Sequence, residues 1–96
     1  YLHGSKLPDK YVSLSLSAAE YLSKKRIYLV GTDFLSIEKR NNPGHPVHKT
    51  LLKNGIVNVE GLDLSNVPPG KYTIACMPLK VVDADGSPAR VFLIKE

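Results

Sequence analysis

Hydrophobic and polar positions along the chain fall into blocks that predict two short helices and several short strands. Residues 18–25 are expected to form the first helix, because Ser17 and Glu20 have the spacing of a capping box. Residues 27–30 read Ile-Tyr-Leu-Val, a continuous apolar run typical of a strand buried on both faces. A short helix followed directly by a buried strand indicates an α/β or α+β fold.

Residues 47–53 are expected to form the second helix. Pro46 precedes it at a position where the missing amide has no cost, and Asn54-Gly55 ends it with residues that tolerate a left-handed backbone. Its expected apolar face consists of Val47, Leu51 and Leu52.

Three strands complete the prediction, at residues 56–60, 72–79 and 90–94. A turn is expected at 67–70, and Asp-Ala-Asp-Gly at 83–86 has the chemistry of a hairpin turn. Residues 1–13 show no periodicity and are expected to form an irregular arm. A chain of 96 residues suits one domain at most, and the order of elements predicts a mixed sheet.

Composition narrows the class of protein. The content of 43% hydrophobic and 23% charged residues is that of a globular chain. The net charge of +4 comes from dispersed bases without interleaved aromatic residues, so nucleic acid is not expected as a partner. One cysteine, Cys76, cannot form an internal disulfide, and no apolar run is long enough to span a membrane; a soluble, cytoplasmic protein is therefore expected.

His48 and Glu60 are the candidate metal ligands. A helix that starts near His48 and a strand that returns to Glu60 have similar lengths, so the two side chains can meet. Imidazole nitrogen and carboxylate oxygen suit zinc, manganese or iron, but a catalytic zinc needs about three protein ligands. His3 lies in the arm and His45 lies just before the helix, so no third ligand is obvious. From these residues alone, a solvated histidine at a helix start and a surface glutamate remain the alternative.

Four runs, in this order, resemble the C-terminal half of the cyclase family that includes bacterial kynurenine formamidases and isatin hydrolases. They are LVGTDFLSIE (29–38), HPVHKTLL (45–52), NGIVNVEGL (54–62) and MPLK with DGSPAR (77–80 and 85–90). The resemblance covers residues 14–94. It implies a swivelling β/β/α fold with one or two divalent metals, and His48 and Glu60 as the ligands from this half.

The resemblance also implies what this chain does not contain. The family's His-x-Gly-Thr-His-x-Asp-x-Pro run, with the histidine expected to act as acid or base, has no counterpart in these residues. We therefore expect residues 1–96 to be the C-terminal portion of a single domain, as a fragment or as one piece of a split enzyme. The missing N-terminal half of the fold is then a required partner.

Asp33 and Ser36 match the family's Gly-x-Asp-x-x-Ser pattern. They are expected either to organise the site or to bond neighbouring backbone amides. Arg90 is expected to be structural, with a carboxylate contact as the alternative.

The function expected from the resemblance is metal-dependent hydrolysis of an amide or lactam C–N bond in a small aromatic substrate. Zinc is the expected metal, with manganese second, and a homo-oligomer is expected. The 96-residue chain alone is expected to be inactive. The alternative is a non-catalytic binding or scaffold domain whose site has decayed.

Overall fold

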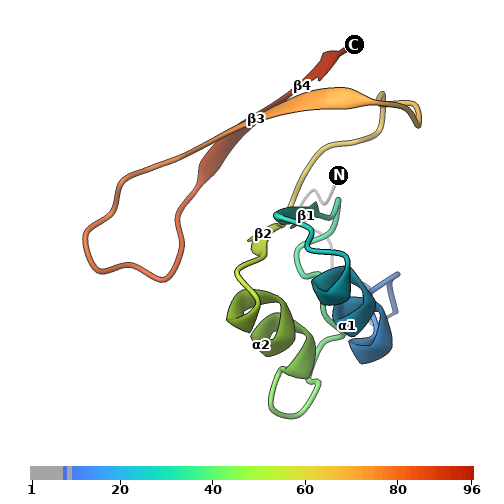
Figure 1. Ribbon diagram of the computed structural model, residues 1–96, viewed down its shortest axis with the longest axis vertical. Helices are drawn as coiled ribbons and strands as arrows, with labels where there is room; N and C mark the ends of the chain where they lie inside the picture. Colours follow the sequence, from blue (N-terminus) through green and yellow to red (C-terminus); the bar gives the residue numbers. More distant parts are fainter. Residues whose placement is uncertain (1–7, 9) are drawn as a thin grey trace. The chain divides into compact units, whose positions relative to one another are not determined.

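The computed structural model describes residue 8 and residues 10–96, so most of the expected arm at 1–13, including His3, lies outside the described residues. The elements follow in the order α1 (Leu16–Lys24), β1 (Leu29–Gly31), α2 (Pro46–Lys53), β2 (Val57–Val59), β3 (Tyr72–Pro78) and β4 (Ala89–Lys95) (Figure 1). The chain divides into two compact units, Tyr1–Ser65 and Asn66–Glu96. Helical and extended elements are both present, which confirms the mixed fold class.

The first unit combines two helices with a parallel pair of strands. β1 pairs with β2 in the register Leu29↔Val57 and Gly31↔Val59. α1 and α2 lie side by side (Figure 1) and pack on one another. The buried core joins both helices to the segments that flank the strands, and consists of Ala19, Ile37, Val47, Leu51 and Ile56, with Leu14, Leu22 and Val30 packed against it.

The start of α1 differs from the prediction. Ser15, not Ser17, is the N-cap, and its hydroxyl accepts a hydrogen bond from the Ala18 amide at 3.1 Å. The Leu14 amide donates to the Ile37 carbonyl at 2.8 Å, and the Leu14 side chain packs on the core. This tertiary contact directs the chain into the helix two residues before the expected cap, so the capping box at Ser17 is wrong.

β1 is also shorter and more exposed than expected. Ile27 and Tyr28 precede the strand and are exposed, whereas Leu29 and Val30 are half-buried. In the part of the chain that the structure describes, β1 pairs with β2 alone. The expected burial on both faces is therefore absent from the described residues, because too little of a sheet surrounds this strand.

α2 follows the prediction closely, with Pro46 in its first turn and Asn54 as its C-cap. Gly55 follows at φ +74°, the left-handed conformation that glycine favours at a helix end. Val47 and Leu51 are buried, but Leu52 is 59% exposed. Leu52 was wrongly assigned to the buried face, because only Val47 and Leu51, four positions apart, lie on the same side of the helix.

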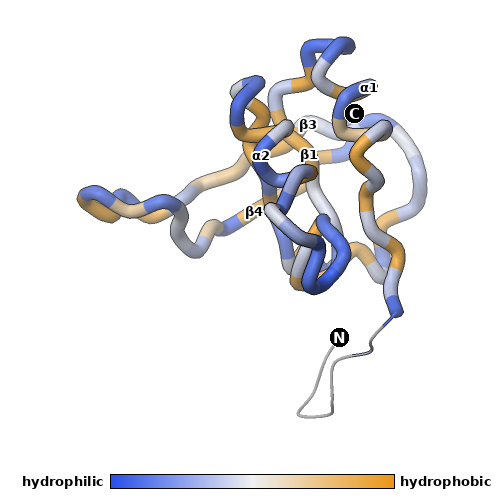
Figure 2. Tube along the Cα trace, turned by 90° about the horizontal axis from the view of Figure 1, so that it is seen from below, coloured by the Kyte–Doolittle hydropathy of each residue, from blue (hydrophilic) through white to orange (hydrophobic). Residues whose placement is uncertain are grey.

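The second unit is an antiparallel pair. β3 and β4 pair from Tyr72↔Lys95 to Pro78↔Ala89, which confirms the strands expected at 72–79 and 90–94. Residues 79–88 join them in a long loop, in which hydrophobic and hydrophilic segments follow one another closely (Figure 2). The turn in this loop has the Ala84 amide bonded to the Val81 carbonyl and Asp83 at φ +55°. It therefore lies earlier than the expected turn at 83–86, and the connection is not a tight hairpin.

Two further residues of this unit were singled out from the sequence. Cys76 is a free, half-buried cysteine in β3. The Arg90 guanidinium lies 5.0 Å from the centre of the Phe92 ring, a cation–π contact that agrees with a structural role. Across residues 8 and 10–96, no helix combines the length and the apolar character that crossing a membrane requires.

Candidate metal centre

His48 occupies the third position of α2, where backbone amides at the helix start lack partners within the helix. The residue before the helix, His45, has a left-handed backbone at φ 47° and makes no side-chain capping bond. Glu38, from the loop that follows β1, takes the place of a local cap. Its carboxylate accepts from the Val47 amide at 2.8 Å and from the His48 amide at 3.2 Å. An anion at this position is also favoured by the helix dipole.

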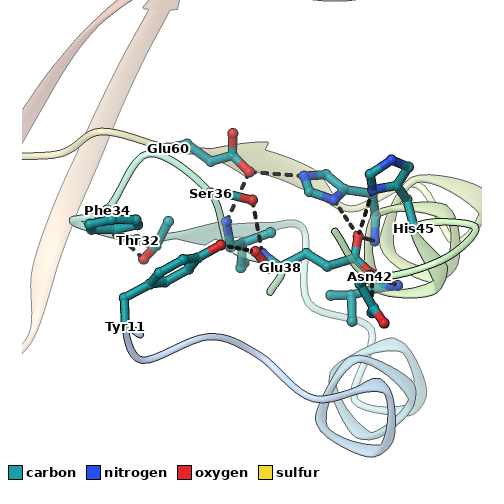
Figure 3. Close-up of polar contacts among 11 residues, drawn as sticks. Tyr11, Thr32, Phe34, Ser36, Glu38, Asn42, His45 and Glu60 are labelled. Carbon is teal, nitrogen blue, oxygen red and sulfur yellow. Dashed lines mark hydrogen bonds and ion pairs between the residues drawn. The ribbon is translucent and has the colours of Figure 1, made fainter. Parts of the chain in front are cut away.

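The Glu38 carboxylate is buried, with 1% of the residue exposed, and both of its oxygens are fully used. Oε2 accepts from Val47 and from the Asn42 side-chain amide at 2.8 Å, and Oε1 accepts from the His48 amide and lies 2.6 Å from His48 Nδ1 (Figure 3). Burial raises the pKa of Glu38, but the hydrogen bonds from His48, Val47 and Asn42 outweigh it and lower the pKa to about 2. Glu38 is therefore ionised at neutral pH.

Glu60 lies at the other side of the His48 ring. His48 Nε2 is 2.9 Å from Glu60 Oε1, and the same oxygen accepts from the Ile37 amide at 3.0 Å (Figure 3). The structure thus brings together the two residues that the sequence paired, twelve positions apart.

Backbone pairing beyond the strands holds this arrangement. The Thr32 amide bonds to the Val59 carbonyl, the Gly61 amide to the Phe34 carbonyl, and the Leu62 amide to the Thr32 carbonyl. The segments that follow β1 and β2 therefore lie side by side, and this places Ile37 next to Glu60.

The two carboxylates fix the protonation of His48. A carboxylate only accepts hydrogen bonds, so the contacts of 2.6 Å with Glu38 and 2.9 Å with Glu60 indicate a proton on both ring nitrogens in this arrangement. Burial lowers the pKa of His48, but the hydrogen bonds to Glu38 and Glu60 raise it, and the net result is a pKa above the ordinary value. A cation between Nε2 and Glu60 would replace the Nε2 proton, and the shorter bond to Glu38 would keep the other proton on Nδ1.

The pair of His48 Nε2 and Glu60 Oε1 fits a divalent cation. Zinc lies about 2.0–2.2 Å from nitrogen and oxygen ligands, which places two ligands of a tetrahedral site about 3.3 Å apart. The observed separation of 2.9 Å is close to this distance, so a small opening would admit an ion. Within the described residues, Glu60 Oε2 makes no hydrogen bond and remains available.

A second group of possible ligands consists of Glu38, His45 and His48, whose ligand atoms lie within 4.8 Å of one another. His45 Nδ1 is 3.8 Å from Glu38 Oε1, beyond hydrogen-bonding distance. An ion here would have to displace the bonds that Glu38 already accepts from the start of α2. The pair formed by His48 Nε2 and Glu60 is therefore the more available site.

Asp33 and Ser36 flank the site without entering it. The Ser36 hydroxyl accepts from the Glu38 amide at 3.2 Å, a local bond of the kind expected as its alternative role. Asp33 is exposed, and its carboxylate has no hydrogen-bond partner in residues 10–96. The sequence prediction missed Glu38 and Asn42. A signal was present, however, because His45 is a poor N-cap and the amides of α2 required another acceptor.

A cleft of about 340 Å³ adjoins the His48 ring. Tyr11 and Phe34 stack with their ring centres 4.1 Å apart on its wall, and the Tyr11 hydroxyl donates to the Glu38 carbonyl. The cleft is lined by a mixture of aromatic, aliphatic, polar and charged side chains, which are Tyr11, Phe34, Leu35, Ser36, Glu38, Lys39, Arg40, Asn41, His45 and His48.

Solved structures with a similar fold indicate the class of protein that this chain resembles. One described as "The Structure Of Potential Metal-Dependent Hydrolase With Cyclase Activity" superposes with a TM-score of 0.81 at 47% identity, over 86% of this chain and 41% of that one. A predicted metal-dependent hydrolase from Bacillus stearothermophilus gives a TM-score of 0.80, also at 47% identity, over 86% and 40%. The chain therefore has part of the fold of these cyclase-like hydrolases.

Curated proteins named kynurenine formamidase and cyclase-like protein are homologues of this chain over about nine tenths of its length. Kynurenine formamidase of Salinibacter ruber is 42% identical over 86 residues, which cover 90% of this chain and 41% of the relative. Cyclase-like protein 3 of Oryza sativa is 44% identical over 87 residues, covering 88% and 32%. The chain thus spans about two fifths or less of the length of these relatives. No protein-family model matches it.

Proposed function

We propose that this chain forms part of a metal-dependent hydrolase that cleaves the amide C–N bond of a small aromatic substrate, as a kynurenine formamidase does. The observation that carries the proposal is the 2.9 Å contact between His48 Nε2 and Glu60 Oε1, in a chain homologous to formamidases. In the assembled enzyme these two side chains are metal ligands. Hydrolysis of the C–N bond of a lactam is the alternative reaction.

A divalent cation supplies Lewis-acid chemistry, because it polarises a carbonyl group and lowers the pKa of water. The residues of this chain hold and orient it. Glu38 keeps the proton of His48 on Nδ1, which leaves Nε2 as a ligand atom, and the Ile37 amide fixes Glu60 Oε1 beside it. Nitrogen and oxygen ligands favour zinc, with manganese as the alternative.

The cleft beside His48 suits the substrate that we propose. Its Tyr11–Phe34 pair offers a flat apolar wall against which an aromatic ring can stack. The base that accepts the proton lies outside the residues of this chain, and Ser36, through its bond from the Glu38 amide, supports the segment after β1 rather than the chemistry. The rest of the same fold is therefore a partner, which agrees with the length of the relatives.

The experiment uses the product of the complete gene, purified and analysed for bound metal, then assayed with an N-formyl arylamine. We expect close to one or two zinc ions per protein, turnover that a chelator abolishes, and recovery with zinc or manganese. A folded product that binds no metal and hydrolyses no formamide would overturn the proposal and support a scaffold domain. Light scattering on the same sample tests the expected homo-oligomer, and the free Cys76 is consistent with the cytoplasm as its location.

A further inference from the structure

The buried Glu38 has no assigned role in metal binding, although it bonds directly to His48. We propose that Glu38 is a positioning residue that fixes the tautomer and the ring orientation of His48, so that Nε2 points at the metal position. The inference deepens the proposed function and rests on it, since it takes His48 as a ligand. Glu38 would act on the metal only through the His48 ring.

The position of this carboxylate is set by the start of a helix. Two backbone amides of α2, those of Val47 and His48, and the side chain of Asn42 all donate to it. Three donors besides the ring therefore immobilise the carboxylate. The His48 ring, which bonds to this carboxylate, is held in place because the carboxylate does not move.

Capping the helix does not by itself require the contact with the ring. Glu38 already accepts from the two free amides, and the bond to Nδ1 is an additional contact at 2.6 Å, shorter than the other bonds of this carboxylate. Its geometry is that of a carboxylate that orients a metal-binding histidine through the nitrogen opposite the metal. The opposite nitrogen, Nε2, faces Glu60.

The same contacts argue against Glu38 as a ligand itself. Each of its oxygens is engaged by two donors, which occupies the acceptor capacity of an ionised carboxylate. Ligation by Glu38 would leave the Val47 and His48 amides without acceptors at a mostly buried helix start, which is costly. Glu38 therefore serves the site as a hydrogen-bond acceptor.

The decisive variant is Glu38→Gln in the product of the complete gene. A glutamine that keeps its oxygen against the Val47 amide turns its NH₂ toward His48 Nδ1, which then becomes an acceptor and moves the proton to Nε2. Loss of such an orienting partner typically costs about 10–100-fold in metal affinity. Glu38→Asp keeps the charge and should recover part of the affinity. Asn42→Ala removes one bond to Oε2 without touching the ring, and serves as the matched control.

Two measurements are made on each folded variant, one of zinc affinity against a chromophoric chelator and one of the His48 tautomer by ¹⁵N NMR of the metal-free protein at alkaline pH. We expect a proton on Nδ1 in the wild type, affinity about 10–100-fold weaker in Glu38→Gln, and less than about threefold weaker in Asn42→Ala. Wild-type affinity in Glu38→Gln, or a proton on Nε2 in the wild type, would overturn the inference. Should Glu38→Gln fail to fold, the wild-type tautomer and Glu38→Asp still decide it.

The two proposals fail in different ways. If zinc binding and the tautomer depend on Glu38 but no formamide is hydrolysed, the positioning role stands and the proposed reaction is wrong. If formamide is hydrolysed and zinc affinity does not depend on Glu38, the reaction stands and the positioning role is wrong.

Discussion

Glu38 bonds to His48 twice, through the backbone amide at 3.2 Å and through ring Nδ1 at 2.6 Å. One carboxylate therefore contacts both the helix start and the side chain that emerges from it. The main chain cannot shift at this point without moving the ring. The candidate site is in this respect part of the fold of the first unit, and its properties can be tested through stability as well as through activity.

Loss of His48 and Glu60 should be strongly non-additive. If both hold one metal, His48→Ala and Glu60→Ala should each remove most activity of the complete gene product, and the double variant should be little worse than either one. Activity assays and thermal melts, with chelator and with added zinc, measure this. If His48→Ala keeps wild-type activity and the wild-type zinc-induced rise in Tm, the ligand assignment is wrong.

The buried face of α2 should dominate the stability of the first unit. Leu51 is fully buried, so Leu51→Ala should lower the free energy of unfolding by about 2–5 kcal/mol. Leu52→Ala is the matched control on the next position, and because Leu52 is 59% exposed its effect should stay within about 0.5 kcal/mol. Urea unfolding monitored by circular dichroism gives both values, and equal losses would contradict the burial described for α2.

Glu38 should make the metal-free protein sensitive to acid. Its pKa falls from the ordinary value of 4.5 to about 2 on folding, so the ionised group stabilises the fold above pH 4.5. This contribution, roughly 3 kcal/mol, should be lost progressively as the pH falls from 4.5 toward 2. Unfolding free energies across this interval, with a chelator present, should fall more steeply for the wild type than for Glu38→Gln. Parallel profiles would show that Glu38 has no depressed pKa.

The 96-residue chain alone should bind zinc more weakly than the complete gene product and hydrolyse no formamide. Two protein ligands leave an ion largely hydrated, and no further base is aligned with the pair within residues 10–96. Isothermal titration with zinc and a formamidase assay on a chain of verified mass test this. Measurable turnover by that chain would refute the prediction.

Most elements were predictable from the sequence because their signals are local. Pro46 and Asn54-Gly55 mark the ends of α2, and the apolar runs mark the strands. The proximity of His48 and Glu60 followed from the similar lengths of a helix and the strand that returns along it. The prediction that the two are metal ligands came only from the resemblance, because spacing alone also fits an ordinary surface pair.

The remaining features depend on contacts between distant segments. Ser15 replaces Ser17 as the cap because Leu14 is tied to Ile37, which no local pattern indicates. Glu38 lies ten positions before His48, and only the folded loop after β1 brings its carboxylate to the helix start. A charged residue in a polar loop ordinarily predicts solvent exposure, so its burial was not visible in the sequence.

Because the Val47 amide donates to Glu38, hydrogen exchange at this amide reports on the position of the Glu38 carboxylate. Whenever the carboxylate leaves the helix start, the Val47 amide becomes free to exchange with solvent deuterium and the His48 ring loses its acceptor. The free energy of exchange at Val47 therefore sets an upper limit on how often the carboxylate is displaced. A backbone measurement made without metal or substrate thus limits how often the His48 ring is without its acceptor.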